Sequence, residues 1–208
     1  MSFLSLLFND PKTYFLWVFL VIFSVSVHEY FHALSAHWQG DNTAAIHGHL
    51  TLNPLVQMGI TSIIFLFLIG IAWGSTPVNP TNFRKRYSHA IVSFAGPFSN
   101  ILLFLSFCLI LAISIKFRFS NEGLSVLCLL GATLNFVLFV FNMLPIPPLD
   151  GFTVASHFFP SLANRNSELK NAAMFIIFIF VFLSFDKLYA FGNYATTFTV
   201  GKLIYFMS

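Results

Sequence analysis

Long runs of apolar residues, separated by short polar stretches, follow one another along the chain. A helix needs about 20 mostly apolar residues to cross the hydrocarbon core of a membrane. Five runs approach or reach that length and predict spanning helices: Tyr14–His37, Val56–Trp73, His89–Ile115, Leu124–Leu144 and Ala172–Leu188. The apolar tail Ala190–Met207, which Gly and Thr interrupt, predicts a sixth element. The pattern therefore predicts an all-α polytopic membrane protein with about five to six transmembrane helices.

The polar segment Gly40–Asn53 lies between the first two apolar runs. Within it, Thr43–Ile46 and Leu50–Asn53 have the pattern of two short strands around a turn at Gly48, which predicts a small β-hairpin. No repeat or inserted soluble domain is visible, so residues 1–208 are predicted to form one membrane-embedded domain. Its core covers about residues 13–160, and C-terminal helices cover about 170–208. No basic excess precedes the first run, which is expected to be a retained helix.

The composition changes the picture by excluding several classes of protein. Hydrophobic residues make up 57% of the chain and charged residues only 8%, whereas soluble domains carry about 25% charged residues. A soluble cytosolic enzyme and a disordered chain are therefore excluded. The net charge of +3 is small and scattered, so we expect a lipid bilayer and no nucleic acid as partner. Cys108 and Cys128 lie in apolar runs and are expected to be lipid- or core-facing thiols, without a disulfide or a shared metal.

Three ionisable side chains occupy the second half of the first apolar run, in the sequence His28-Glu29-Tyr30-Phe31-His32. A charged group near the centre of a membrane costs about 2.5–3.5 kcal/mol, so such groups are usually functional. Residues four apart lie on one face of a helix, so His28 and His32 can reach one ion, with Glu29 beside it. This is the His-Glu-x-x-His arrangement of zinc hydrolases, in which the glutamate acts as the base. The alternative is that neighbouring helices satisfy these polar groups.

A catalytic zinc also needs a third protein ligand and an open position for water. Among the seven acidic residues, only Asp150 follows a segment suited to deliver it to a buried site. Pro145, Pro147 and Pro148 break the helix before it, and Gly151 permits a sharp turn after it. Irregular backbone at membrane depth is tolerated where it is buried in protein or lines a watery cavity. Asp150 is therefore predicted to point into such a cavity, with a helix terminator at the membrane surface as the alternative.

Several short motifs along the chain have counterparts in a known family. His28–Ala33 and Asn142–Gly151 together resemble the metal-binding motifs of the site-2 protease family of intramembrane zinc metalloproteases. Gly96–Asn100 is similar to the family's Gly-Pro-x-x-Asn signature. Leu50–Pro54 and Pro77–Arg84 resemble motifs of its compact bacterial branch, which lacks a PDZ domain. The resemblance covers about residues 13–160.

The resemblance implies hydrolysis of peptide bonds within or near transmembrane segments of membrane-protein substrates. One Zn²⁺ would be held by His28, His32 and Asp150, and Glu29 would serve as general base toward a zinc-activated water. Asn142 would hold the substrate backbone or the oxyanion. Its alternative role is to bond backbone groups that the prolines leave unpaired.

The roles of three further polar residues are not assigned by the sequence. Gln57 stands where the compact branch has a histidine or another polar residue, so the sequence does not assign its role. His47 and His49 flank Gly48 and alternate with it, which makes a second metal site conceivable. Solvated or hydrogen-bonded turn histidines are the preferred interpretation.

The number of membrane crossings between the two histidines and Asp150 gives a prediction about the second apolar run. If the four runs before Asp150 all crossed the membrane, Asp150 would lie across the bilayer from the two histidines and could not share an ion with them. Val56–Trp73 is the segment expected not to cross, because Gly and Pro residues break its far end. It is predicted to re-enter or pair with the following loop, and then to return. The basic cluster Arg84–Arg86 would mark that side as cytoplasm, so the active site would face the cytosol of a multi-pass protein in the bacterial inner membrane.

The expected substrate is a single-span or tail-like membrane protein with helix-weakening residues near the cut. The predicted hairpin could receive it as an added strand. The sequence does not specify the oligomeric state. Two alternatives from other classes are a metal-ion transporter and a non-catalytic membrane scaffold. A transporter would more often show duplicated halves, and it gives Glu29 no reason to lie beside a ligand.

Overall fold

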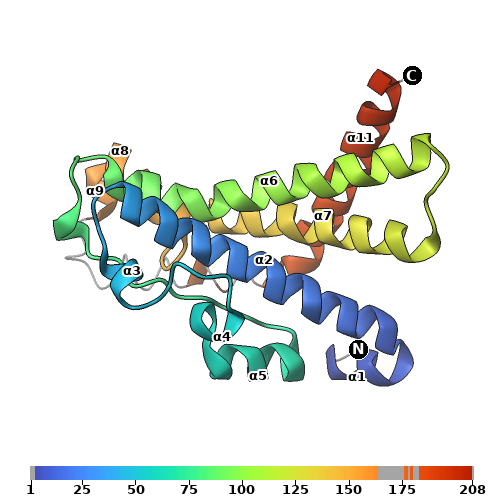
Figure 1. Ribbon diagram of the computed structural model, residues 1–208, viewed down its shortest axis with the longest axis horizontal. Helices are drawn as coiled ribbons and strands as arrows, with labels where there is room; N and C mark the ends of the chain where they lie inside the picture. Colours follow the sequence, from blue (N-terminus) through green and yellow to red (C-terminus); the bar gives the residue numbers. More distant parts are fainter. Residues whose placement is uncertain (1–2, 164–175, 178, 180–182, 208) are drawn as a thin grey trace. The chain divides into compact units, whose positions relative to one another are not determined.

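The computed structural model describes residues 3–163, 176–177, 179 and 183–207 (Figure 1). Over these residues the chain is helical and contains no strand, which confirms the all-α prediction. It divides into two compact units, Met1–Lys85 and Arg86–Ser208, each of which is described by itself. The assignment of residues 1–208 to one domain stays a prediction.

Three helices in the described part of the chain are long and apolar enough to cross a membrane: α2 (Pro11–Trp38), α6 (Ser88–Lys116) and α7 (Glu122–Asn142). They correspond to the first, third and fourth predicted spans. About half of the fifth predicted span, Ala172–Leu188, lies outside the described residues, and its last part, from Phe185 on, belongs to α11. The tail belongs to α11 (Phe185–Met207), which is not among the candidate spans. Five to six crossings are therefore not confirmed.

The first unit is built on α2, which follows the short helix α1 (Phe3–Asn9). Asp10 caps α2, since its carboxylate accepts a hydrogen bond from the N–H of Thr13 at 3.1 Å. The exposed side of α2 carries apolar rings, whereas its buried side carries hydroxyl, imidazole and carboxyl groups. The exposed rings are Phe15, Phe19 and Phe23, and the buried polar residues are Ser24, Ser26, His28, Glu29, His32 and Ser35. Ionisable groups turned away from lipid are what a membrane helix requires.

The predicted β-hairpin after α2 is wrong. Thr43–Ile46 forms a helical turn, α3, because the Asp41 carboxylate accepts hydrogen bonds from the backbone N–H of Thr43 at 3.0 Å and from its hydroxyl at 2.5 Å. Leu50–Asn53 is irregular, and in it the Thr51 hydroxyl accepts a hydrogen bond from the backbone N–H of Asn53 at 3.2 Å. Side-chain bonds to nearby backbone compete with strand pairing. A substrate strand therefore has no hairpin edge to pair with in this segment.

The chain after α3 leaves the C-terminal end of α2 and returns to it. Helix α5 (Gly59–Ile69) has 11 residues and extends only about 16 Å, too short to cross a membrane. Its far end reaches the start of α2, where the Tyr14 hydroxyl donates to the carbonyl of Phe67 at 2.6 Å. An extended stretch then runs back, and the N–H of Arg84 donates to the carbonyl of Gln39 at 3.0 Å. The second apolar run thus forms no helix long enough to span a membrane, and the chain returns to the C-terminal end of α2, while its re-entry into the membrane stays a prediction.

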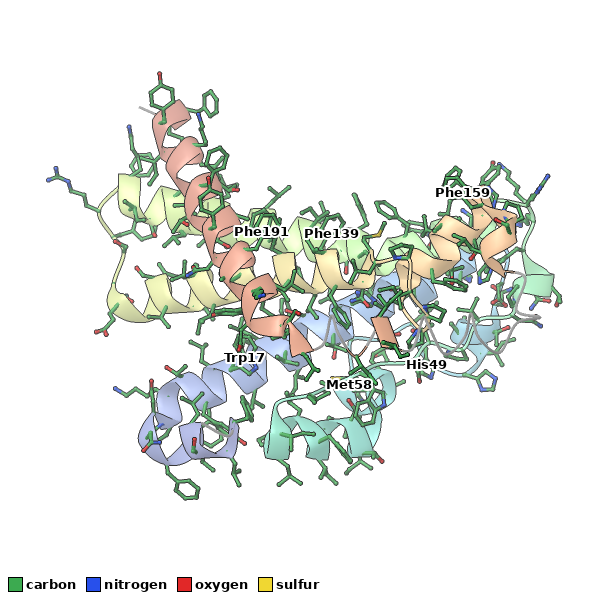
Figure 2. All side chains as sticks on the ribbon, turned by 180° about the vertical axis from the view of Figure 1, so that it is seen from behind. Trp17, His49, Met58, Phe139, Phe159 and Phe191 are labelled. Carbon is green, nitrogen blue, oxygen red and sulfur yellow. The ribbon has the colours of Figure 1, made fainter. Side chains whose placement is uncertain are left out.

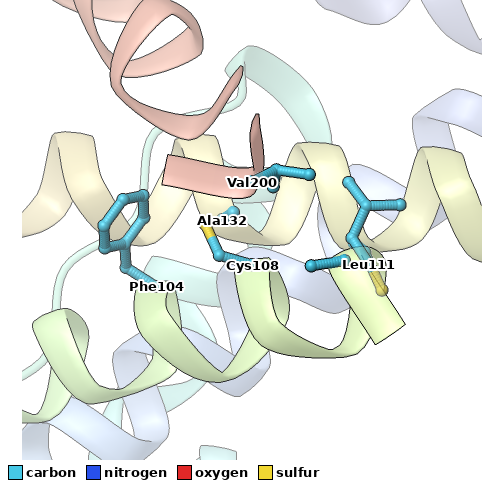
Figure 3. Packing of buried hydrophobic residues seen from close by; sticks show 7 residues of the cluster. Phe104, Cys108, Leu111, Ala132 and Val200 are labelled. Carbon is cyan, nitrogen blue, oxygen red and sulfur yellow. The ribbon is translucent and has the colours of Figure 1, made fainter. Parts of the chain in front are cut away.

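In the second unit, α6 and α7 lie side by side, and α11 packs against both (Figure 1). Their shared core consists of Phe104, Cys108, Leu111, Ala112, Cys128, Ala132 and Val200 (Figure 3). Both cysteines are free and buried, so of the two predicted environments, lipid and core, the structure shows the core. Polar bonds also join the helices. Asn100 Nδ2 donates to Asn135 Oδ1 at 3.0 Å between α6 and α7, and the Thr133 and Thr196 hydroxyls lie 3.2 Å apart between α7 and α11.

Candidate metal centre

His28 and His32 lie one turn apart on the buried side of α2. Their Nε2 atoms are 3.0 Å apart, and the two rings are nearly perpendicular, at an interplanar angle of 78°. A tetrahedral zinc ion at about 2.0–2.1 Å from each nitrogen holds two imidazole nitrogens about 3.3 Å apart. The pair therefore fits one zinc ion after a movement of about 0.3 Å.

The Glu29 side chain is buried and contacts the extended segment that returns from α5. The Thr76 hydroxyl lies 2.8 Å from Glu29 Oε2 and 3.0 Å from the Glu29 carbonyl oxygen, and its single proton can be donated to either acceptor. Gly74 passes so close that a Cβ atom there would overlap the Glu29 side chain. Gly74 and Thr76 together therefore determine where the carboxyl group can lie.

Two further contacts anchor this extended segment, Trp73–Asn79, along its length. Ser62 Oγ on α5 accepts from the N–H of Trp73 at 2.8 Å and donates to the carbonyl of the same residue at 2.6 Å. The N–H of Ser75 donates to the carbonyl of Gln57 at 3.0 Å. The segment thus pairs with the helices before it, which is one of the two arrangements predicted for the second apolar run. Its contacts at Trp73 and Ser75 fix its position on both sides of Gly74.

Asp41 anchors the end of the same segment. Its carboxylate is buried and accepts hydrogen bonds from Thr43, from the N–H of Asn79 at 2.6 Å and from the side-chain amide of Asn82 at 2.9 Å. Burial raises the pKa of Asp41, but these hydrogen bonds outweigh that effect and hold the pKa below its ordinary value. The ionised carboxylate is therefore the form that fastens the short helix η1 (Pro80–Asn82) to the loop after α2.

Gln57, the last residue of α4 (Pro54–Gln57), links two loops. Its buried side chain donates from Nε2 to the carbonyls of His49, at 2.8 Å, and Thr51. The backbone carbonyl of Gln57 accepts a hydrogen bond from the N–H of Ser75 at 3.0 Å. Figure 2 shows His49 on the stretch that leads into α4. The role that the sequence left open is therefore one of positioning, since Gln57 holds the His49 loop and the Trp73–Asn79 segment together.

Asp150 is the first residue of α8 (Asp150–Phe158) in the second unit, and α9 (Pro160–Ala163) follows that helix. Gly151 packs so tightly that a Cβ atom there would overlap the backbone of Met143. The proline-broken stretch between α7 and α8 thus folds back closely on itself. This close packing of the backbone sets the position at which α8, and with it Asp150, begins.

Asn142 ends α7 and donates from Nδ2 to the carbonyl of Leu138, one turn earlier, at 3.0 Å. This bond secures the last turn of the helix before the prolines. The amide carries two N–H donors, so the bond to Leu138 leaves room for a second contact.

The sequence-predicted site residues fall in both units. The first unit brings His28, Glu29 and His32 together on one turn of α2, and the second holds Asn142 and Asp150 at the two ends of the proline-broken stretch. As donor types, two imidazoles and one carboxylate make up a ligand set that could hold a metal ion.

Sequence reasoning missed Gly74 and Thr76. They lie in the polar stretch after the second apolar run, just before the family-like motif that begins at Pro77, and no motif marks these two positions. The available signal was the count of membrane crossings, which required the chain to return to the side of the membrane nearer to His28 and His32.

Comparison with known proteins gives consistent matches. The model of peptidase family M50 matches residues 113–184. The chain is 35% identical over 175 residues to "Putative zinc metalloprotease YwhC" of Bacillus subtilis, with 80% of each chain covered. It is 30% identical to "Putative zinc metalloprotease Rip2" of Mycobacterium tuberculosis, over 76% of this chain and 63% of that protein. The Rip2 of Mycolicibacterium smegmatis is 28% identical, with the same coverage of 76% and 63%. No solved structure matches the chain.

Proposed function

Because this chain belongs to peptidase family M50, the family of the site-2 protease that its motifs resemble, we propose that it is a zinc metalloprotease that cuts membrane proteins within or near their transmembrane segments. Its class, a membrane metalloprotease, follows from the family and from the apolar helices. The observation that carries the proposal is the buried turn of α2, which holds two imidazole nitrogens 3.0 Å apart and, next to His28 in the chain, a carboxyl group bonded by Thr76.

The proposed ligands of one zinc ion are His28, His32 and Asp150. Two facing imidazoles suit the ion, and a carboxylate is a regular third partner of two histidines in catalytic zinc sites. Bound there, zinc would lower the pKa of a coordinated water to about 7 and polarise the carbonyl of the peptide bond.

The chain's own groups then handle the proton. Glu29 follows His28 directly, so its carboxylate can take a proton from the attacking water and deliver it to the leaving amine. The hydrogen bond from Thr76 occupies Oε2 and leaves Oε1 to exchange the proton. Asn142 is the proposed donor to the substrate backbone or to the oxyanion, through the amide N–H that does not bond Leu138.

The proposed substrate is a single-span or tail-like membrane protein with helix-weakening residues near the cut. A helical segment buries its peptide bonds in its own hydrogen bonds, so it must unwind before a carboxylate and a water can reach one. The proposed location is the bacterial inner membrane, with the site open to the cytoplasm. The basic cluster Arg84–Arg86 supports this orientation, because Arg84 bonds the C-terminal end of α2, the end nearer to His28 and His32.

The test compares the full chain with its Glu29→Gln and His32→Ala variants in detergent or liposomes. Each protein is incubated with a panel of single-span membrane proteins and analysed for bound zinc. We expect Glu29→Gln to keep its zinc and to lose cleavage by a factor on the order of 10²–10⁴, whereas His32→Ala loses both zinc and cleavage. Cleavage by Glu29→Gln at the wild-type rate would contradict the proposal. Zinc flux into liposomes that persists in Glu29→Gln, without any cleavage by the wild type, would identify a transporter instead.

A further inference from the structure

A cavity of about 400 Å³ lies in the first unit and is lined by His47, His49, Ser75, Thr76 and Pro77. It opens between the loop that precedes α4 and the extended segment that returns from α5. Four of these five residues carry hydrogen-bonding side chains, two imidazoles and two hydroxyl groups, in a chain with 57% hydrophobic residues. Neither the metal ligands nor the general base belong to this lining.

Thr76 connects the cavity to the site of reaction. The same residue that lines the cavity also donates its hydroxyl to Glu29 Oε2 at 2.8 Å. A group bound in the cavity is therefore separated from the general base by one side chain. Since an extended peptide advances about 3.3 Å per residue, this places the cavity within about two residues of a peptide bond at Glu29.

His49 indicates which chemistry the cavity would accept. Its Nδ1 atom is buried and has no hydrogen-bond partner among the described residues. A buried N–H without a partner costs more than a buried lone pair, which favours the tautomer with the proton on Nε2. The imidazole then offers an N–H donor from Nε2, and Ser75, which also lines the cavity, carries a hydroxyl donor.

The two walls of the cavity are held at a fixed separation. Gln57 donates to the His49 carbonyl on one wall at 2.8 Å, and the N–H of Ser75 on the other wall donates to the Gln57 carbonyl at 3.0 Å. A pre-formed gap between hydrogen-bonding walls is a property of binding sites, because little ordering remains to be done when the ligand enters.

From these observations we infer that the cavity is a substrate subsite that accepts a hydrogen-bond-accepting side chain, a carboxamide or a carboxylate, close to the scissile bond. The inference rests on the proposed protease function. It predicts that substrates carry Asn, Gln, Asp or Glu at one position near the cut. Such a residue would also weaken a transmembrane helix, so recognition and unwinding would be served by the same side chain.

The test measures binding separately from cleavage. The Glu29→Gln chain, in detergent, is titrated with fluorescent single-span peptides that are identical except for Asn, Asp, Ser, Ala or Leu at one scanned position. A neutral hydrogen bond contributes a factor of about 3 to 10, so we expect the Asn or Asp peptide to bind 3- to 10-fold more tightly than the Leu peptide at one position only. His49→Phe, which keeps a ring and removes the donor, should abolish that preference. His49→Gln, whose Nε2 replaces the imidazole donor, should retain it.

His37→Ala is the matched control, since this histidine lies in the same unit and does not line the cavity. It should keep the preference. Equal affinity for all peptides at every scanned position would overturn the subsite, and so would a uniform loss of affinity in His49→Phe that leaves the preference intact. Failure of the protease function would be observed in a separate measurement, the cleavage assay, as a wild-type chain that binds zinc and cuts none of the peptides. Tighter binding of the Asn or Asp peptide without any cleavage would therefore support the binding site and contradict the protease function.

Discussion

The hydroxyl of Thr76 donates to the carboxyl group of Glu29 at 2.8 Å, although 47 residues separate the two along the chain. The contact exists because α5 is too short to cross a membrane and the chain returns along α2. It couples the proposed general base to a segment that is itself anchored at Ser62, Gln57 and Asp41. The position of the base is thus determined by the returning loop as well as by its own helix.

Removing this hydroxyl should slow the chemistry without removing the metal. A hydrogen bond to a charged group contributes about 1.5–3 kcal/mol, so Thr76→Val should lower kcat by about 10- to 100-fold. Thr76→Ser keeps the hydroxyl and should remain within about threefold of the wild type. Zinc content and kcat, measured on one single-span substrate, check both values. A Thr76→Ser variant as slow as Thr76→Val would show that the methyl group, and not the hydrogen bond, matters.

Gly74 is required by the volume of the Glu29 side chain. Alanine at this position would bring a Cβ atom into overlap with the carboxyl group, which must then move. Because a misplacement of about 1 Å can cost a factor of about 10², we expect Gly74→Ala to lower kcat by about that factor and to leave bound zinc unchanged. Gly201→Ala is the control, since nothing lies within 4 Å of a Cβ atom there. Full activity in Gly74→Ala would mean that the segment can shift without disturbing the base.

The sequence predicted the helices that apolar length defines. The run His89–Ile115 is long enough as a helix to cross a bilayer, and the bounds of α6 differ from it by one residue at each end. It also predicted the pair His28 and His32, because helical periodicity alone puts residues four apart on one face. The short segments were less predictable. Thr43–Ile46 has the composition of a strand, yet one carboxylate, Asp41, bonds its first residue and makes a helical turn.

The contacts of Thr76 and Gly74 could not be predicted for a different reason. They depend on where an extended segment returns after an excursion through α4 and α5, and an irregular segment has no periodicity that marks its buried side. The number of membrane crossings required a return but did not fix its register. A shift of one residue would have placed Ser75, which also carries a hydroxyl, beside Glu29.

The anchor at Asp41 should make the first unit sensitive to acid. Its pKa is lowered in the folded chain, so the carboxylate contributes stability at pH values above the unfolded pKa of about 3.9, and that contribution is lost as the pH falls through the folded value. Asp41→Asn should therefore be less stable than the wild type at pH 7, by about 1.5–3 kcal/mol, and the difference should shrink below about pH 4. Thermal unfolding in detergent from pH 3 to pH 7 measures this. A difference that does not change with pH would show that the carboxylate charge is not involved.

The pair Asn100 and Asn135 should hold α6 and α7 together with a modest energy. The amide of Asn100 donates to Asn135 at 3.0 Å, both side chains are buried, and Asn135 donates in turn to the carbonyl of Gly131 at 2.8 Å. Hydrogen bonds between membrane helices average about 0.6 kcal/mol in double-mutant cycles and reach about 1.7 kcal/mol, because the separated helices find other partners in the membrane. A cycle of Asn100→Ala, Asn135→Ala and the double variant, measured by unfolding in mixed detergent, should give a coupling energy in that range. Additive effects of the two single variants would mean that Asn100 does not join the two helices through Asn135. The zinc content of each variant would then show whether Asn100 affects the metal centre.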